Sequence, residues 1–190
     1  DRMLSLESKV HVEGVGGAQV LDFLLNCDDV AYQRWWPGTH LRCHTVRHES
    51  EALGNVIMMD EWVGRHRLRF EGVVTAWEPA KRLELQLRFK GVTLPAWLDI
   101  SCDDDARGTT VRHTVRAGFE GGPGQRLVEP LVRAVFFRGD FPLALDAHVK
   151  DEFPRLAAML AQPDRPILPV SSTWRARARW SVSPSSCSPS

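Results

Sequence analysis

The chain has 190 residues, of which 43% are hydrophobic and 25% charged, and this size and apolar content predict one globular domain with a substantial core. Lys plus Arg and Asp plus Glu number 24 each, so no overall field recruits nucleic acid or an anionic membrane, and we expect neither as a partner. No apolar run approaches the roughly 20 residues that cross a bilayer, and the first residues lack the layout of a secretion signal. These features predict a cytoplasmic protein without stable membrane insertion.

The cysteines are too few and too scattered for a disulfide scaffold. Cys27, Cys43, Cys102 and Cys187 are far apart in the sequence and form no C-x-x-C motif. A chain of this length that depended on disulfides would carry more of them at closer spacing. We therefore expect reduced, structural thiols.

The N-terminal part of the chain predicts a strand followed by two short helices. Residues 4–12 alternate loosely between apolar and polar, and apolar residues recur at helical spacing over 18–36, with a polar break at 26–28. Between them, the run Gly14-Val15-Gly16-Gly17 is followed by Gln19, where a dinucleotide-binding loop requires its third glycine. The glycines therefore predict a tight turn and no nucleotide site.

The next eighty residues have the pattern of strands separated by turn residues. The predicted strands run over 40–48, 54–63, 66–77, 82–90, 95–103 and 108–119. Connections this short favour an antiparallel meander. In the last strand, Val111, His113 and Val115 share one face, so we expect His113 to lie among apolar neighbours.

The C-terminal third predicts a long helix and then a tail. Apolar residues form a helical stripe over 125–160, with Pro142 expected to kink or restart the helix and Gly139-Asp140 to provide a break and an N-cap. Residues 162–190 are rich in Pro, Ser and Arg without a periodic apolar face, which predicts disorder. The basic and aromatic run Trp174–Trp180 allows membrane or nucleic-acid contact, but we favour an extension without function.

Three short motifs accompany this order of elements: Val20–Leu24 followed by Arg34–Gly38, then Val74–Leu83, and then Gly108–Val111. Together with the order of elements, they resemble the START-like (SRPBCC) superfamily, which includes lipid carriers and polyketide cyclases. The first motif is similar to the opening helices of that superfamily, the second to its Pro-containing turn between strands, and the third to the start of its last strand. The resemblance covers residues 4–160 and divides the chain into a domain at 1–161 and a tail at 162–190.

The resemblance implies an α+β helix-grip fold, in which a curved antiparallel sheet of about seven strands wraps round a long C-terminal helix. It also implies a cavity suited to lipids, polyketides or other apolar molecules, and it carries no universal catalytic residue. The expected ligand-binding side chains come from strand parity where it is clear, over 82–90 and 108–119, and otherwise from apolar or aromatic character. They are Met58, Phe70, Leu85, Leu87, Leu98, Val111, His113, Val115 and Phe141.

The polar candidates each have two interpretations. A neutral His113 could hydrogen-bond a ligand carbonyl or hydroxyl, or be a core histidine satisfied by its neighbours, which we favour. His148 and Glu152 are one helical turn apart, which allows an acid–base pair or a surface contact. Asp60, Arg69 and Glu71 have ambiguous parity, and we expect exposed charges on the convex face.

The sequence predicts no metal site and no cofactor. His40, His44 and His48 are spaced by four residues, but four residues of a strand span about 13 Å, too far for neighbours to share one zinc ion. We expect these histidines at the surface or at the rim of the cavity.

Three functions remain open at this point. The leading hypothesis is a carrier or sensor for a hydrophobic small molecule, and the second is an enzyme of the polyketide cyclase or aromatase type; the third is an interaction module with a collapsed cavity. The enzyme requires at least two titratable side chains that converge in the cavity. A cavity smaller than about 300 Å³ would count against a carrier. The oligomeric state is not predicted.

Overall fold

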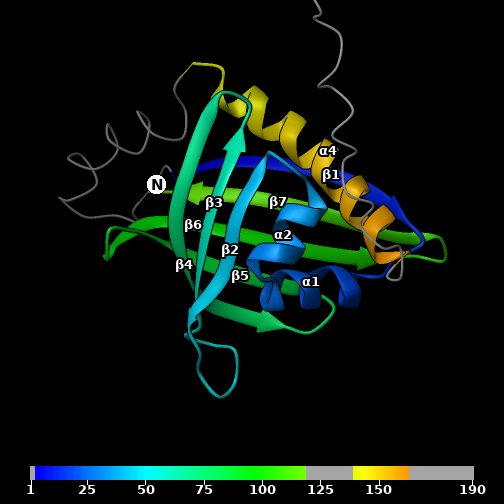
Figure 1. Ribbon diagram of the computed structural model, residues 1–190, viewed down its shortest axis with the longest axis horizontal. Helices are drawn as coiled ribbons and strands as arrows, with labels where there is room; N and C mark the ends of the chain where they lie inside the picture. The colour runs from blue at the N-terminus through cyan, green and yellow to red at the C-terminus, as the bar shows by residue number, and fades with distance from the viewer. Residues whose placement is uncertain (1–2, 119–138, 163–190) are drawn as a thin grey trace, which may run out of the picture.

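The computed structural model describes residues 3–118 and 139–162, and within them it confirms the α+β helix-grip architecture. Figure 1 shows the strands as one curved sheet with the helices on its concave side. The elements in chain order are β1 (Leu4–Glu13), α1 (Gly17–Asn26), α2 (Asp29–Trp35), β2 (His40–Arg47), β3 (Val56–Val63), β4 (His66–Glu78), β5 (Arg82–Phe89), β6 (Val92–Asp104), β7 (Gly108–Ala117) and α4 (Phe141–Leu160).

The sheet is antiparallel throughout, in the order β1-β7-β6-β5-β4-β3-β2. The six later strands form the expected meander, and β1 closes the sheet by pairing with β7 from Leu4↔Ala117 to Glu13↔Gly108. Directly paired residues have side chains on the same face of a sheet. The pairings therefore decide which residues point toward the helices and which point outward.

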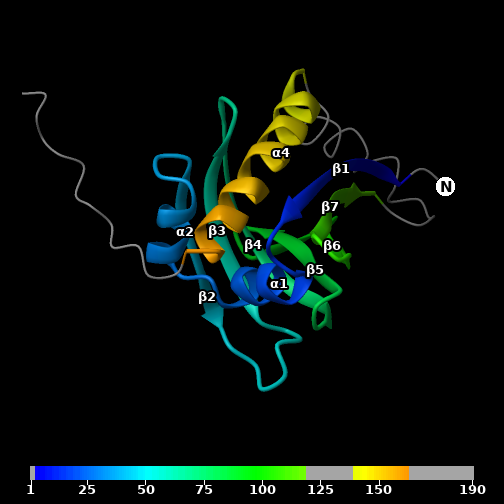
Figure 2. The same cartoon turned by 90° about the vertical axis from the view of Figure 1, so that its right-hand side faces the viewer.

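Helix α4 crosses the concave side of the sheet, with β1 on one flank and β3 on the other (Figure 2). Its buried stripe includes Leu145, Val149, Phe153 and Leu156, which pack into the core. These residues recur at intervals of three and four, which places them along one face of the helix. The helix therefore forms one wall of whatever space the sheet encloses.

The start of α4 differs from a simple capped helix. Pro142 lies in the first turn, where its missing N–H has no intrahelical partner in any case. Asp140 occupies the expected N-cap position, but its carboxylate contacts the β3–β4 turn, at 3.1 Å from Arg65 Nη2 and 3.0 Å from His66 Nε2. The part of the predicted helix at 125–138, like the predicted tail at 163–190, lies outside the described residues.

A tight approach explains the glycine-rich turn between β1 and α1. A Cβ atom on Gly17 would lie 2.5 Å from the Cβ of Cys102 and 2.6 Å from the carbonyl oxygen of Ala80. The backbone N–H of Gly17 donates to Asp104 Oδ1 at 2.7 Å. This packing fixes the start of α1 against the end of β6, so the glycines have a structural role.

Strand β6 begins earlier than predicted and passes through a proline. Gln86 pairs with Trp97, but Arg88 pairs with Thr93, so β6 has extra residues opposite Leu87. Proline is tolerated at such a bulge because its missing N–H is not needed for the ladder. The pairing therefore continues beyond Pro95 to Val92.

None of the described helices is both long enough and apolar enough to cross a membrane.

Candidate functional site

A small internal cavity lies between the concave face of the sheet and the helices. Its volume is about 50 Å³, which leaves room for a few water molecules, since each needs about 10–15 Å³. Pockets for drug-sized ligands measure roughly 300–1,000 Å³. The lining side chains are Leu24, Cys27, Tyr32, Trp35, Cys43, Ile57, Met59, Glu61, Leu83, Leu85, Leu98, Ile100, His113, Glu152 and Phe153.

Three of the nine side chains expected to line the cavity do so, namely Leu85, Leu98 and His113. Four others are buried in the core beside it without lining it: Leu87, Val111, Val115 and Phe141. Phe70 is half-buried, and it shares the face of Met59 because the two residues are paired across β3 and β4. Parity in the strands of Leu85 and His113 therefore gives the concave face, but the cavity occupies only a short length of it.

Met58 is on the face of β3 opposite the cavity. The cavity is lined by Ile57, Met59 and Glu61, which alternate along this strand. Met58 alternates with them and so points outward with Asp60. Met59, rather than Met58, is thus the methionine at the cavity.

The polar end of the site is a cluster of two histidines and two carboxylates that come from three elements. His40 begins β2, Glu61 lies on β3, and His148 and Glu152 are one turn apart on α4. One ring nitrogen or carboxylate oxygen from each side chain lies within 4.8 Å of the corresponding atoms of the other three. We refer to these four residues as the His/Glu cluster.

The distances within the His/Glu cluster are short. His148 Nε2 lies 3.1 Å from Glu152 Oε2 and 3.6 Å from Glu61 Oε2. His40 Nε2 lies 3.4 Å from Glu152 Oε2 and 3.6 Å from Glu61 Oε2. Yet neither Nε2 atom has a partner in hydrogen-bonding geometry within the described parts of the chain. The nitrogen and oxygen atoms therefore converge without directed N–H···O bonds.

An aromatic frame orients the cluster. The ring of Tyr32 stacks on His40 with centroids 4.0 Å apart, and its hydroxyl donates to Glu61 Oε2 at 2.5 Å. The ring of Trp36 stacks on His148 at 4.9 Å. Both aromatic residues come from α2 or its end, so this short helix supplies the walls that fix both imidazoles.

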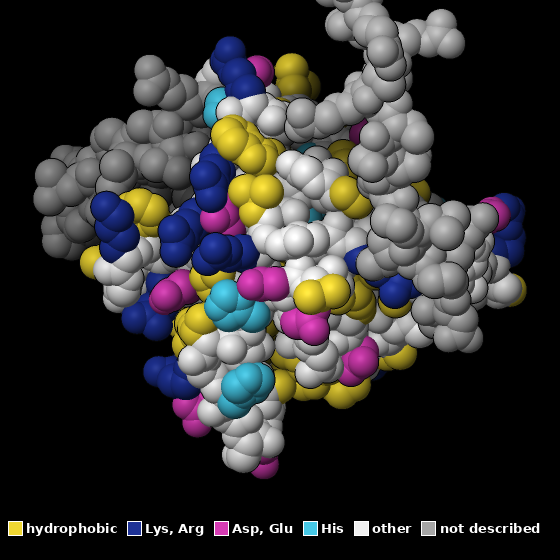
Figure 3. Space-filling view, viewed as in Figure 1, with side chains coloured by type: hydrophobic (Ala, Val, Ile, Leu, Met, Phe, Trp, Pro, Cys, Tyr) yellow, Lys and Arg dark blue, Asp and Glu magenta, His cyan; other side chains and the backbone are white. Residues whose placement is uncertain are grey.

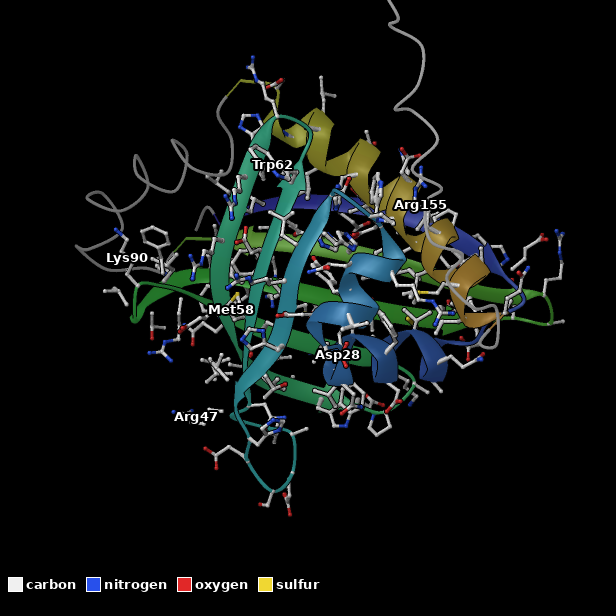
Figure 4. The ribbon with its side chains drawn as sticks, in the orientation of Figure 1. Asp28, Arg47, Met58, Trp62, Lys90 and Arg155 are labelled. Atoms are coloured by element: carbon white, nitrogen blue, oxygen red, sulfur yellow. The ribbon has the colours of Figure 1, made fainter. Side chains whose placement is uncertain are left out.

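Two further aromatic contacts connect α2 and its end to α4 beside the His/Glu cluster. Trp35 Nε1 donates to the backbone carbonyl of Glu152 at 2.7 Å, which joins α2 to α4. Arg155, labelled in Figure 4, places its guanidinium over Trp36 at 4.7 Å. These contacts limit the freedom of both helices beside the cluster.

The cluster shifts the ionisation of its own members. Burial alone would lower the pKa of His148, but the carboxylates of Glu152 and Glu61 outweigh it and raise the pKa to about 10. Burial opposes ionisation of Glu152, yet His148 and His40 hold the pKa of this carboxyl below its usual value. Burial, assisted by Glu61, raises the pKa of the Tyr32 phenol. At neutral pH, His148 and Glu152 therefore form a buried charged pair.

His113 lies apart from the cluster but lines the same cavity. Its side chain is buried on β7, and its Nδ1 atom has no hydrogen-bond partner among the described residues. Burial lowers the pKa of His113, and the charges of Glu152 and Glu61 oppose this effect. A neutral imidazole with one open nitrogen thus borders the apolar cavity, and the expectation of a core histidine satisfied by its neighbours does not hold for Nδ1.

Several expectations for the polar residues need correction. His40 is buried, with 1% of its surface exposed, because Tyr32, Trp35 and Trp36 surround it. His148 and Glu152 are each 6% exposed and form an internal pair, so the surface-contact interpretation is wrong.

Asp60 does lie on the convex face, but it is only 2% exposed, because Arg67 donates to both of its oxygens at 2.9 Å. Arg69 is exposed as expected, and Glu71 is half-buried near Arg88. Figure 3 shows Lys and Arg side chains gathered on the viewed face with acidic side chains among them.

The three histidines at four-residue spacing are not brought together. His44 contacts Asp29 at 2.8 Å, and His48 lies beyond the end of β2 at an exposed position. Only His40 joins the buried cluster. The equal spacing of the three histidines gave no sign that His40 pairs with Glu61, and parity could not identify Glu61 because Met58 and Met59 are both apolar.

Comparisons with known proteins agree on the fold. No protein-family model and no curated protein sequence matches the chain. Among solved structures, the KanY protein is 12% identical over 84% of this chain and 99% of its own, with a TM-score of 0.56. A Staphylococcus aureus protein of unknown function is 8% identical over 85% of this chain and 97% of its own, with a TM-score of 0.53.

A third structure, of a protein from Nitrosomonas europaea, is 16% identical over 84% of this chain and 96% of its own, with a TM-score of 0.50. Likeness at such low identity concerns the backbone and not the chemistry of a site. These similarities therefore establish the fold, and the function must be argued from the residues around the cavity.

Proposed function

We propose that this START-like helix-grip domain binds a small organic molecule in its internal cavity and transfers a proton to or from it through His113. The observation that carries this proposal is the meeting of an apolar cavity with one imidazole and two carboxyl groups, those of His113, Glu61 and Glu152. A site for proton transfer needs such convergence, whereas a simple carrier does not.

The aliphatic walls would hold the apolar part of the molecule. Leu85, Leu98 and Ile100 line the sheet side of the cavity, and Phe153 lines the helix side. Burial of apolar surface contributes roughly 25 cal/mol per Å². Apolar contacts are not directional, so the orientation of the bound molecule depends on His113, Glu61 and Glu152.

His113 is suited to proton transfer because it is held neutral. An imidazole with an open Nδ1 can accept a proton from a bound molecule. The carboxylates of Glu152 and Glu61 then stabilise the imidazolium that forms, since both favour its charged form. This arrangement supports chemistry such as abstraction of a proton beside a carbonyl group.

The cavity size favours a small substrate over a lipid or a complete polyketide. A volume of about 50 Å³ fits only a few non-hydrogen atoms unless the walls move apart. A carrier or sensor for a bulky apolar ligand is therefore the second candidate. An interaction module with a collapsed cavity is less favoured, because buried charges such as those of Glu152 and His148 are costly to retain without a role.

Deuterium exchange into acetone tests the proposal. In D₂O, the wild-type protein should accelerate loss of the acetone methyl protons as followed by proton NMR. His113→Ala should reduce this catalysed rate by about 10²–10⁴-fold, the usual contribution of a general base. His44→Ala is the matched control, because His44 lies outside the cavity and contacts Asp29. A wild-type rate equal to that of His113→Ala would overturn the proposal.

A further inference from the structure

The His/Glu cluster has the composition of a metal site. We propose that His40 Nε2, Glu61 Oε2, His148 Nε2 and Glu152 Oε2 together bind one divalent transition-metal ion, with Zn²⁺ as the best fit. Imidazole nitrogen and carboxylate oxygen are both common zinc ligands. This inference deepens the proposed function, because Glu61 and Glu152 also line the cavity.

Four of the six spacings between the ligand atoms are compatible with a tetrahedral site. Ligand atoms at about 2.0–2.2 Å from a tetrahedral zinc ion lie about 3.3–3.6 Å from one another. The four nitrogen-to-oxygen distances in the His/Glu cluster are 3.1, 3.4, 3.6 and 3.6 Å. Four edges of the tetrahedron are thus already close to the length that the ion requires.

The unpartnered nitrogen atoms provide a second, independent observation. Both ring nitrogens of His40 and the Nε2 atom of His148 lack a hydrogen-bond partner within the described residues, although these side chains are more than nine-tenths buried. Buried polar atoms normally find a partner. An ion between the four residues would satisfy both Nε2 atoms through their lone pairs, which explains why their N–H directions miss the nearby carboxylates.

The sheet and the helix each bring two ligands together. His40 and Glu61 are direct partners across β2 and β3, so backbone pairing alone places them side by side. His148 and Glu152 are one turn apart on α4. The stacked rings of Tyr32 and Trp36 fix the two imidazoles, and the Tyr32 hydroxyl holds Glu61. Such outer contacts are typical of sites that are prepared for a metal.

Charge also favours a dication. Two carboxylates face each other across the His/Glu cluster, and one divalent cation would neutralise them both while the imidazoles stay neutral. Zinc can expand from four to five ligands. A carbonyl or hydroxyl oxygen that enters the cavity from the side of Glu61 and Glu152 could take the fifth position, which would polarise it beside His113.

The experiment measures metal binding without any organic ligand. The full chain is stripped with a chelator, dialysed, and titrated with Zn²⁺ by calorimetry and with Co²⁺ by visible absorption. We expect one ion per chain and the intense visible bands of tetrahedral Co²⁺. His148→Ala and the near-isosteric Glu152→Gln should each weaken Zn²⁺ binding by at least about 100-fold, more than the loss of an outer-shell partner.

Two control variants make the test specific. His44→Ala removes a half-exposed histidine outside the cluster, and His113→Ala removes a buried histidine that is not a proposed ligand. Both should keep one ion per chain. Circular dichroism establishes that each variant is folded, and Glu152→Gln serves if His148→Ala is not. Absence of stoichiometric binding, or equal loss in His44→Ala, would overturn the metal site.

The failure of this inference can be separated from failure of the proposed function. Stoichiometric zinc binding without acetone exchange would support the metal site and contradict proton transfer. His113-dependent exchange by protein that binds no ion would contradict the metal site and support proton transfer.

Discussion

Helix α4 carries two ion pairs with the same four-residue spacing in opposite surroundings. Asp146 and Lys150 are 2.7 Å apart, with side chains 40% and 55% exposed, whereas His148 and Glu152 are 3.1 Å apart and only 5% and 8% exposed. A shift of two residues turns the helix by about 200°, which moves a side chain to the other face. The same local geometry therefore gives a solvated contact on one face and a candidate site on the other.

The four-residue spacing alone does not assign a role to either pair. Water screens the outer pair, so replacing either of its members should change the free energy of unfolding little. The inner pair depends on Glu61, His40 and the aromatic frame, because a buried charge without its partners is strongly unfavourable. Four substitutions test how far the surroundings of a charged pair decide its role.

The largest loss of stability is expected from removing a large side chain on the buried face of α4. Phe153 is 1% exposed, packs near Trp35 and lines the cavity beside Glu152. Phe153→Ala should reduce the free energy of unfolding by about 3–5 kcal/mol, as measured by urea denaturation. Leu143→Ala, at a position 77% exposed on the same helix, should stay within about 0.5 kcal/mol of wild type. Equal losses in the two variants would remove the contrast between the faces.

Loss of His148 should change how the free energy of unfolding depends on pH in the alkaline range. In metal-free protein the pKa of His148 is raised to about 10, so its charged form stabilises the fold below the unfolded value of about 6.5 and this stabilisation is lost as the pH rises toward 10. The free energy of unfolding of the wild type should fall by about 3 kcal/mol over this window. In His148→Gln, measured by urea denaturation in the presence of a chelator, this fall should be absent. An identical alkaline slope in both proteins would contradict the prediction.

The ion pair of Asp60 and Arg67 on the convex face of the sheet should instead affect stability in the acid range. Arg67 hydrogen-bonds the Asp60 carboxylate and lowers its pKa, so Asp60 contributes stability above about pH 4 that is lost as the pH falls through the lowered value. Asp60→Asn should remove about 1 kcal/mol at pH 7 and flatten part of the acid limb of thermal unfolding. Zinc binding should be unaffected, and a loss of zinc affinity would link the two faces of β3.

The smallest effect is expected at the outer pair of α4. Lys150→Ala removes the contact with Asp146 and should change the free energy of unfolding by only about 0.2–0.5 kcal/mol. Added salt should diminish even this difference, because the pair is exposed. Chemical denaturation at low and high salt measures both quantities. An effect as large as that of His148→Gln would show that exposure does not separate the two pairs.

The sequence was sufficient for the architecture because each element carries its own local signal. The alternation over Leu83–Phe89 and the glycine and proline residues at the turns locate the strands. Parity also predicted that Leu85 and His113 share the inward faces of their strands, and both line the cavity. In β3 this signal failed, because Met58 and Met59 are both apolar and either could point inward.

The His/Glu cluster could not be derived in the same way because its members meet only through tertiary structure. The pairing of His40 with Glu61 depends on the register of β2 and β3, and the docking of α4 brings His148 and Glu152 to them. The spacing of His148 and Glu152 was visible in the sequence, but their burial was not. The small volume of the cavity likewise depends on how closely the side chains pack.

The direct pairing of His40 with Glu61 has a consequence for how the gene can change. The register already shifts between His40 and Arg42, where Leu41 is an extra residue. Loss of this extra residue, or an insertion or deletion elsewhere in β2 or β3 that no bulge absorbs, would send one of these side chains to the outer face. Point substitutions elsewhere in the two strands would leave both where they are. A descendant of this chain that retains the cluster must therefore also retain the length of both strands between the turn and the site.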